Sequence, residues 1–274
     1  MTNPQNRVSL INSYFWPVIF SFYKYQGTGN DFIMIDDRLN FFPINKEIFL
    51  RLCDRKKGIG ADGLILIKNS DSADFHMEYY NPDGSKSFCG NGSRCAVAFA
   101  FRLGIIGKTT TFTAFDGTHH GQLFDNNIVK VSMGDVDGIE NMDLDLVLNT
   151  GSPHYVRFVS ALENENVLET GRAIRYSEKF KKVGVNVNLA ERLDTQTLKC
   201  QTYERGVENE TLSCGTGVTA VALAANFEYD LKPPLTIITK GGELKVNFDK
   251  SDKSFINITL EGPVKAVFKG EINA

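Results

Sequence analysis

The chain has 274 residues, and 42% of them are hydrophobic. This length favours two domains, and the hydrophobic content is sufficient for sizeable cores, which excludes a mainly disordered chain. Thirty Lys and Arg residues against 33 Asp and Glu residues leave a net charge of -3. That balance excludes the broad basic surface of a nucleic-acid-binding protein, so we expect a small-molecule partner.

The five cysteines are an odd number spread through a chain of medium length. This usage does not suit the disulfide framework of a small secreted domain and favours a reducing cytoplasm. We expect Cys53, Cys95 and Cys200 to be small buried side chains. Cys89 and Cys95 have poor spacing for metal ligands, and nothing nearby completes a set, so no metal site is expected.

Residues 8–23 form an aromatic-rich apolar run that follows Arg7. A signal sequence is one interpretation. However, Pro17 breaks a helix there, no small-residue cleavage site follows, and the run is too short and too polar to span a bilayer. We therefore expect no membrane association, and interpret the run as an edge strand with a disordered leader, or as the result of a translation start placed too early.

Beyond the leader, short apolar or alternating segments predict many strands separated by glycine-rich turns. The clearest strand segments are residues 32–36, 64–67, 128–133, 243–248 and 255–260. Two Ala-rich runs interrupt this pattern, and each predicts a helix that is buried on all sides. The first helix follows Cys89-Gly90-Asn91-Gly92, and the second follows Cys214-Gly215-Thr216-Gly217.

Similar strand segments follow both helices, so the chain contains an internal repeat. We predict an α+β fold with two pseudo-symmetric domains, each a strand layer or barrel around one central helix. The predicted division is an extension at 1–21, a first half at 22–134 plus 264–274, and a second half at 135–263. The final strand is thus expected to return to the first half.

The two C-G-x-G turns indicate chemistry as well as structure. Glycines let the backbone approach a ligand closely, and the first N–H groups of the helix stay free to bind a carboxylate. The same field predicts a lowered pKa for the thiols of Cys89 and Cys214. Two thiols on opposite sides of a carboxylate suit the inversion of the adjacent stereocentre, because one removes a proton and the other returns one. Cofactor-independent racemisation or epimerisation of an amino acid fits this arrangement.

From about Tyr23 onward, the sequence resembles the diaminopimelate epimerase family. The resemblance includes eight ordered motifs: residues 25–32, 58–64, 81–85, 88–95, 151–154, 184–188, 203–211 and 213–217. It implies conversion of LL-diaminopimelate to the meso form in lysine and peptidoglycan biosynthesis, without metal or pyridoxal phosphate, by Cys89 and Cys214. It also implies a homodimer.

The same resemblance implies a set of substrate-binding residues. These are the side chains of Asn30, Asn81, Asn186, Glu204 and Arg205, with the backbone of Gly90-Asn91 and Gly215-Thr216 around the reacting carboxylate. Arg205 offers a bidentate fork for a distal carboxylate, and Glu204 an acceptor for an ammonium group. Since neighbours on a regular strand point to opposite faces, we expect a bulge or a strand end at Glu204-Arg205.

Two residues depart from the family pattern: Ser152 replaces an Asn of many members, and Gly63 a Gln of some. Their substrate contacts therefore stay open, as does the role of residue His154, which suits a site edge or a structural position. One alternative function is a proline or hydroxyproline racemase of the same fold, although such enzymes have His at the position of Asn91 and Asp at that of Ser213. A thiol hydrolase or a redox protein is the other alternative.

Overall fold

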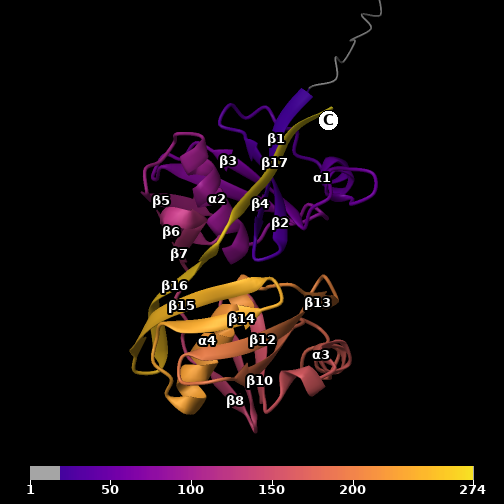
Figure 1. Ribbon diagram of the computed structural model, residues 1–274. Coiled ribbons are helices and arrows are strands. Elements are labelled where there is room, and N and C mark those ends of the chain that lie inside the picture. Colours follow the sequence, from indigo (N-terminus) through magenta and orange to yellow (C-terminus); the bar gives the residue numbers. More distant parts are fainter. Residues whose placement is uncertain (1–18, 274) are drawn as a thin grey trace, which may run out of the picture.

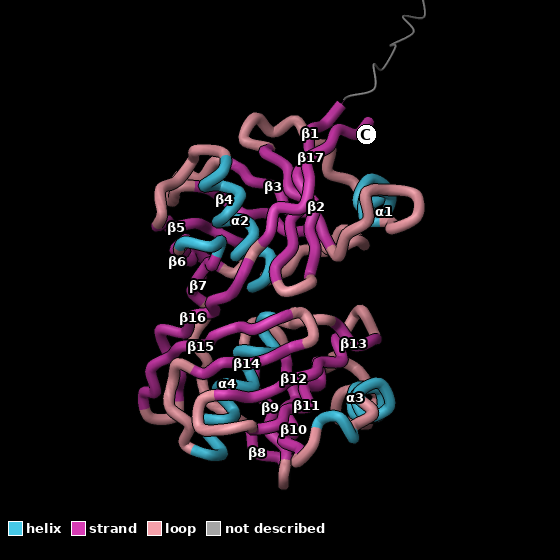
Figure 2. Tube along the Cα trace, viewed as in Figure 1, coloured by secondary structure: helices cyan, strands magenta, loops and turns pink. Residues whose placement is uncertain are grey.

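Figure 1 shows the computed structural model, which describes residues 19–273 and has two halves stacked end to end. The strands of the first half curve around helix α2, and those of the second half around α4 (Figure 2). The elements of the first half are β1 (Ile19–Gly27), β2 (Asn30–Asp36), α1 (Lys46–Cys53), β3 (Gly63–Lys68), β4 (Phe75–Tyr80), α2 (Gly90–Arg102), β5 (Thr109–Ala114), β6 (Gly117–Leu123) and β7 (Ile128–Ser132).

The second half begins with a small hairpin and repeats the same plan. Its elements are β8 (Glu140–Met142), β9 (Asp145–Asn149), β10 (Pro153–Val159), α3 (Val167–Arg175), β11 (Asn186–Arg192), β12 (Thr197–Glu204), β13 (Asn209–Thr211), α4 (Gly215–Tyr229), β14 (Leu235–Thr239), β15 (Gly242–Ser251) and β16 (Ser254–Pro263). The last strand is β17 (Lys265–Asn273), and 3₁₀ turns lie at Asp125–Asn127 and Leu162–Asn164. All five strand segments expected from the sequence are present.

The internal repeat is visible in the order of strand pairing. In the first half, β2 and β3 are parallel, β3 and β4 antiparallel, β4 and β5 parallel, and β5 and β6 antiparallel. The pairs β10–β11, β11–β12, β12–β14 and β14–β15 follow the same order in the second half. The predicted fold class, an α+β fold with one central helix in each of two pseudo-symmetric halves, is therefore confirmed.

Two strand pairs connect the halves and the chain ends. Strand β7 pairs with β16, which makes the sheet continuous between the halves. Strand β17 lies antiparallel to β1, so the C-terminal strand runs beside the first strand (Figure 1). Ile19–Ser21, the last residues of the expected extension, lie in β1 opposite Glu271–Asn273. The rest of that extension lies outside the described residues.

In each half the sheet has the central helix on its inner face and a short helix on its outer face. One large core surrounds α2 and α4, and two smaller cores lie under α1 and α3. The strand segment Leu64–Ile67 is therefore covered on both faces, by α2 and by α1, which explains its unbroken apolar run. Neither α1 nor α3 was predicted from the sequence. Both are short, and each begins with an Asn side chain that accepts a hydrogen bond from the first turn, at Asn45 and Asn166.

Candidate active site

Cys89 lies at the N-cap of α2. Its Sγ accepts a hydrogen bond from the backbone N–H of Gly92 at 3.4 Å and lies 3.7 Å from Asn30 Oδ1, to which the thiol donates. A β-carbon at Gly92 would lie only 3.0 Å from Ile65 Cδ1, so a side chain at this position would force Ile65 to shift. The turn thus aims one thiol and several free N–H groups out of the helix end.

Cys214 occupies the equivalent N-cap of α4, and its Sγ lies 3.4 Å from Thr216 Oγ1. The two helix ends meet at glycines. A β-carbon at Gly90 would lie 3.0 Å from Leu260 Cδ2, and one at Gly215 would lie 3.1 Å from the same atom. The missing side chains let the two N-termini converge, so both helix dipoles favour negative charge in the space between them.

That space is a cavity of about 900 Å³ between the two halves. It is lined by every residue that the sequence analysis assigned to the site: Asn30, Asn81, Cys89, Gly90, Asn91, Asn186, Glu204, Arg205, Cys214, Gly215 and Thr216. Other lining residues were not predicted from the sequence, among them Arg55, Asp62 and Tyr79. Asp62 lies inside the 58–64 motif, which was the available signal.

Asp62 orients Asn30. Its Oδ2 accepts hydrogen bonds from Asn30 Nδ2 at 2.7 Å and from the backbone N–H of Asp31 at 3.1 Å, and its Oδ1 pairs with Arg55 at 2.6 Å. Because the Asn30 amide nitrogen donates to Asp62, the amide oxygen must face Cys89. An acceptor is thereby held beside the first thiol.

Asn186 fixes the backbone beside the cavity. Its Oδ1 accepts from the N–H of Arg205 at 2.8 Å, and its Nδ2 donates to Ser152 Oγ at 3.0 Å. Arg205 Nη2 lies 3.4 Å from the same hydroxyl. Ser152, one of the two positions that depart from the family pattern, therefore contacts both Asn186 and Arg205. Strand β12 ends at Glu204, so the expected strand end is present, and both Glu204 and Arg205 line the cavity.

The second departure, Gly63, makes room for Tyr79. A β-carbon at Gly63 would lie 2.4 Å from Tyr79 Cε2 and 2.8 Å from its hydroxyl oxygen. Tyr79 donates a hydrogen bond to Asn81 Oδ1 at 3.0 Å, while Asn81 Nδ2 donates to the carbonyl and hydroxyl of Ser85. The absent side chain at position 63 is thus replaced by a phenol that orients Asn81.

Glu204 is an acidic group whose charge acts on both thiols. Its side chain accepts a hydrogen bond from Thr211 Oγ1 at 3.0 Å and forms no ion pair within the described part of the chain. Burial, with a smaller contribution from the charge of Asp62, raises its pKa to about 6. Because the carboxylate is buried and has no ion-pair partner among the described residues, a cation that enters the cavity can pair with it.

The predicted lowering of the thiol pKa values is wrong for the ligand-free protein. Burial raises the pKa of Cys89 to about 12 and also raises that of Cys214, and the negative charge of Glu204 adds to both effects. The helix N–H groups and Thr216 act in the opposite direction without overcoming burial. Both cysteines are free, and without a ligand both are protonated.

His154 is fully buried behind Cys214, so it holds a structural position. The Asn188 amide nitrogen lies 3.0 Å from Nδ1, closer than the 3.4 Å between Nε2 and the Asn186 amide nitrogen. Nδ1 is therefore the acceptor, and Nε2–H donates to Thr216 Oγ1 at 2.9 Å. Burial lowers the pKa of His154 to about 3, so the ring is neutral. The Thr216 hydroxyl hydrogen is left to point at Cys214 Sγ, where it favours a thiolate.

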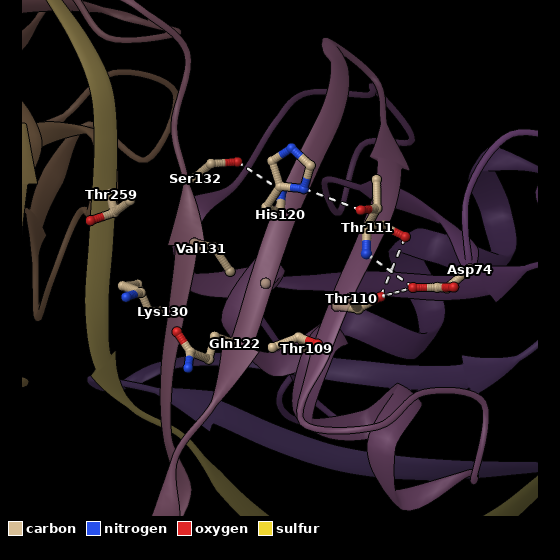
Figure 3. Close-up of a pocket in the computed structure, with 11 residues that line it drawn as sticks. Asp74, Thr109, Thr110, Thr111, His120, Gln122, Lys130, Val131, Ser132 and Thr259 are labelled. Atoms are coloured by element: carbon tan, nitrogen blue, oxygen red, sulfur yellow. Dashed lines mark hydrogen bonds between the residues drawn. The ribbon is translucent and has the colours of Figure 1, made fainter.

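A second hollow lies on the outer face of β5, β6 and β7 (Figure 3). Its polar groups are largely paired with one another. Asp74 Oδ2 accepts from Thr110 Oγ1 at 2.8 Å and from the N–H of Thr111 at 3.0 Å, and His120 contacts Thr111 Oγ1. It contains no thiol and none of the residues predicted for the site, so the cavity between the halves is the candidate active site.

Comparison with known proteins identifies the family of this chain. A family model described as diaminopimelate epimerase matches residues 22–139 and 146–267. A diaminopimelate epimerase from Flavobacterium psychrophilum is 49% identical over 253 residues, which cover 91% of this chain and 99% of that protein. One from Aquifex aeolicus is 42% identical over 276 residues, covering 92% of this chain and 97% of that protein.

Two solved structures share the fold at low sequence identity. A Bacillus anthracis phenazine biosynthesis protein of the PhzF family has a TM-score of 0.74 at 13% identity, covering 94% of this chain and 100% of that one. A hydroxyproline epimerase from Agrobacterium vitis has a TM-score of 0.68 at 14% identity, covering 94% and 93%. At these identities the likeness concerns the fold alone.

Proposed function

Because the chain belongs to the diaminopimelate epimerase family, we propose that it converts LL-2,6-diaminopimelate to meso-diaminopimelate without a cofactor. The observation that carries the proposal is the pair of cysteines at converging helix N-termini, on opposite halves of one cavity. We propose that the product, meso-diaminopimelate, is used in lysine and peptidoglycan biosynthesis.

The cavity supplies complementary groups for both ends of such a substrate. The N–H groups of Gly90-Asn91 and Gly215-Thr216 bind the carboxylate next to the reacting carbon. At the other end, Arg205 binds the distal carboxylate; among the described residues its guanidinium contacts only the Val183 carbonyl and Ser152. Glu204 accepts a substrate ammonium.

In the reaction, one cysteine as a thiolate removes the α-proton from one face, and the other as a thiol returns a proton to the opposite face. The charge that develops on the substrate carboxylate is stabilised by the free helix N–H groups. The thiol and thiolate roles of Cys89 and Cys214 exchange with the handedness of the substrate, so their titrations are coupled.

Substrate binding favours the formation of a thiolate. The charge of Glu204 raises the pKa of both Cys89 and Cys214 in the empty cavity. An ammonium group paired with Glu204 cancels that charge, so the same event that binds the substrate favours ionisation of a thiol. Occupation of the cavity thus removes one of the two effects that raise the pKa of the thiols, while burial remains.

We also propose that the protein is located in the cytoplasm and forms a homodimer. All five cysteines are free, which suits a reducing compartment. Strand β17 pairs with β1 on one side, and within residues 19–273 its other edge has no partner, with Val267 and Phe268 about half exposed. Light scattering should give a molar mass of twice that of the chain. In Phe268→Lys the molar mass should fall to that of a single chain.

We also assign the halves as residues 22–134 plus 264–274 and residues 135–263. The pairing of β17 with β1 supports the return of the C-terminal strand to the first half. Within residues 19–273, none of the helices has both the length and the apolar character needed to cross a membrane.

Direct assays distinguish the alternatives. We expect turnover of LL-diaminopimelate, measured by chiral chromatography, and none of L-proline or hydroxyproline, since Asn91 and Ser213 stand where proline racemases have His and Asp. Turnover of proline instead would establish the racemase. An acyl-enzyme on Cys214, detected by mass spectrometry in Cys89→Ala, would indicate a hydrolase, and a catalytic disulfide cycle a redox protein.

A further inference from the structure

Arg94 lies in the second turn of α2, behind the candidate active site, and is fully buried. It is among the largest side chains that the fold buries completely. A guanidinium at such depth normally has a carboxylate or several carbonyls around it, because an unpaired charge is costly to remove from water. Arg94 has neither.

The partners of its guanidinium are few. Nη1 donates to the carbonyl of Gly90 at 3.4 Å and Nη2 to Thr28 Oγ1 at 3.2 Å, while Nε has no hydrogen-bond partner. Among the described residues, no Asp or Glu forms an ion pair with it, and the groups that oppose the effect of burial on its pKa are the thiols of Cys95 and Cys89. Burial lowers the pKa of Arg94 to about 10, so it stays charged at neutral pH.

The surrounding backbone is shaped for this side chain. A β-carbon at Gly27, the end of β1, would lie 3.2 Å from Arg94 Nη2. A β-carbon at Gly262, in the strand that joins the two halves, would lie 3.4 Å from Nε. A side chain at Gly27 would therefore crowd the guanidinium, whereas a β-carbon at Gly262 would only touch it and would clash with Leu244 Cδ2 at 2.2 Å.

Arg94 is also linked to the second half. Thr28 Oγ1, which accepts from Arg94, donates to Ser213 Oγ at 3.1 Å, and Ser213 directly precedes Cys214. Thr28 and Ser213 are both buried. A second connection runs from Asn91 Nδ2 to the Ser213 carbonyl at 3.2 Å. The segment that carries one cysteine is therefore held by the helix that carries the other.

We propose that Arg94 is a positioning residue of the proposed epimerase. Its unpaired positive charge stabilises negative charge at Cys89, and its hydrogen bond to Thr28 holds the turn that contacts the Cys214 segment. The inference rests on the proposed function only for the catalytic step; the effect on the thiol does not depend on which substrate is bound.

The groups around Cys89 support the electrostatic part. The two charged groups that act on it most are Glu204, which raises its pKa, and Arg94, which lowers it. The other ionisable neighbours are Cys95, Cys214 and Tyr79, and each is neutral because burial raises its pKa. Arg94 is thus the fixed charge that offsets Glu204 in the ligand-free protein.

The test compares Arg94→Met, which removes the charge, with Arg94→Lys, which keeps the charge but shortens the reach to Thr28. Arg102→Met is the matched control, since Arg102 is an exposed residue at the far end of the same helix. The alkylation rates of Cys89 and Cys214 by iodoacetamide are measured by peptide mass spectrometry over a series of pH values in the ligand-free proteins. Circular dichroism checks folding.

In Arg94→Met we expect alkylation of Cys89 to be about tenfold slower at each pH, which corresponds to about one pKa unit. Alkylation of Cys214 should change less than about twofold, and epimerase kcat should fall with little change in KM. Arg94→Lys should keep the Cys89 rate within about threefold while kcat falls, because the link to Thr28 is lost.

An unchanged Cys89 rate in folded Arg94→Met would overturn the proposal, as would an equal loss in Arg102→Met. If Arg94→Met does not fold, Arg94→Lys decides: a Cys89 rate that falls tenfold despite the retained charge, or an unchanged kcat, contradicts the proposal. A wild-type protein without epimerase activity would refute the proposed function and leave the alkylation result interpretable.

Discussion

Glu204→Gln should stabilise the ligand-free protein while it destroys substrate binding. Burial raises the pKa of this carboxyl from 4.5 to about 6. A raised pKa means that the folded state holds the proton more tightly than the unfolded state. Between these two pH values the free energy of unfolding therefore falls as pH rises, and above about pH 6 the full penalty is present. The difference of about 1.5 pKa units corresponds to about 2 kcal/mol.

Gln keeps the shape and can still accept the hydrogen bond from Thr211, so at pH 8 the variant should gain up to about 2 kcal/mol. Urea denaturation at a series of pH values measures this. Wild type should lose about 2 kcal/mol between pH 4.5 and 7 relative to Glu204→Gln. In the variant kcat/KM should fall about 100-fold, because the charged acceptor for the substrate ammonium is gone.

Glu243→Gln is the matched control, since Glu243 is an exposed residue of β15. It should leave both the unfolding free energy and kcat/KM unchanged. The reasoning would be refuted if Glu204→Gln were no more stable than wild type at pH 8, or if the two proteins had parallel stability profiles across this pH range.

Three further predictions concern the groups around the thiols. Mild oxidation should pair Cys89 with Cys214 and abolish activity, and a reductant should restore it; an oxidised, active protein in which both thiols remain free would contradict this. Thr216→Val removes the hydroxyl 3.4 Å from Cys214 Sγ and should lower kcat about tenfold while KM changes little, as measured by steady-state kinetics. Tyr79→Phe frees Asn81 Oδ1 and should raise KM several-fold; an unchanged KM would show that the phenol does not orient Asn81.

The parts of the fold that depend on local patterns could be predicted from the sequence. The C-G-x-G turns and the Ala-rich runs identified α2 and α4, and their likeness revealed the two halves. The helix α1 was missed because only eight residues and an Asn cap mark it. Its apolar face contacts a sheet that the local pattern does not reveal.

The residues predicted for the site all line the cavity, but the electrostatics of the cavity were not predicted. A helix N-terminus lowers a thiol pKa, and this led to the wrong prediction for Cys89 and Cys214, because the extent of burial and the approach of Glu204 depend on residues far apart in the chain. The role of Gly63 could not be predicted either, because it also depends on a residue distant in the sequence. The ring of Tyr79 occupies the space where a side chain at position 63 would lie.

The central claim is that two cysteines exchange a proton at the α-carbon from opposite faces. Incubation with LL-diaminopimelate in deuterated water, followed by NMR and mass spectrometry of the product, tests it most directly. We expect meso-diaminopimelate with one solvent deuterium at the inverted carbon, and no inversion by Cys89→Ala or Cys214→Ala. A meso product without solvent deuterium, or near wild-type turnover in either alanine variant, would contradict it.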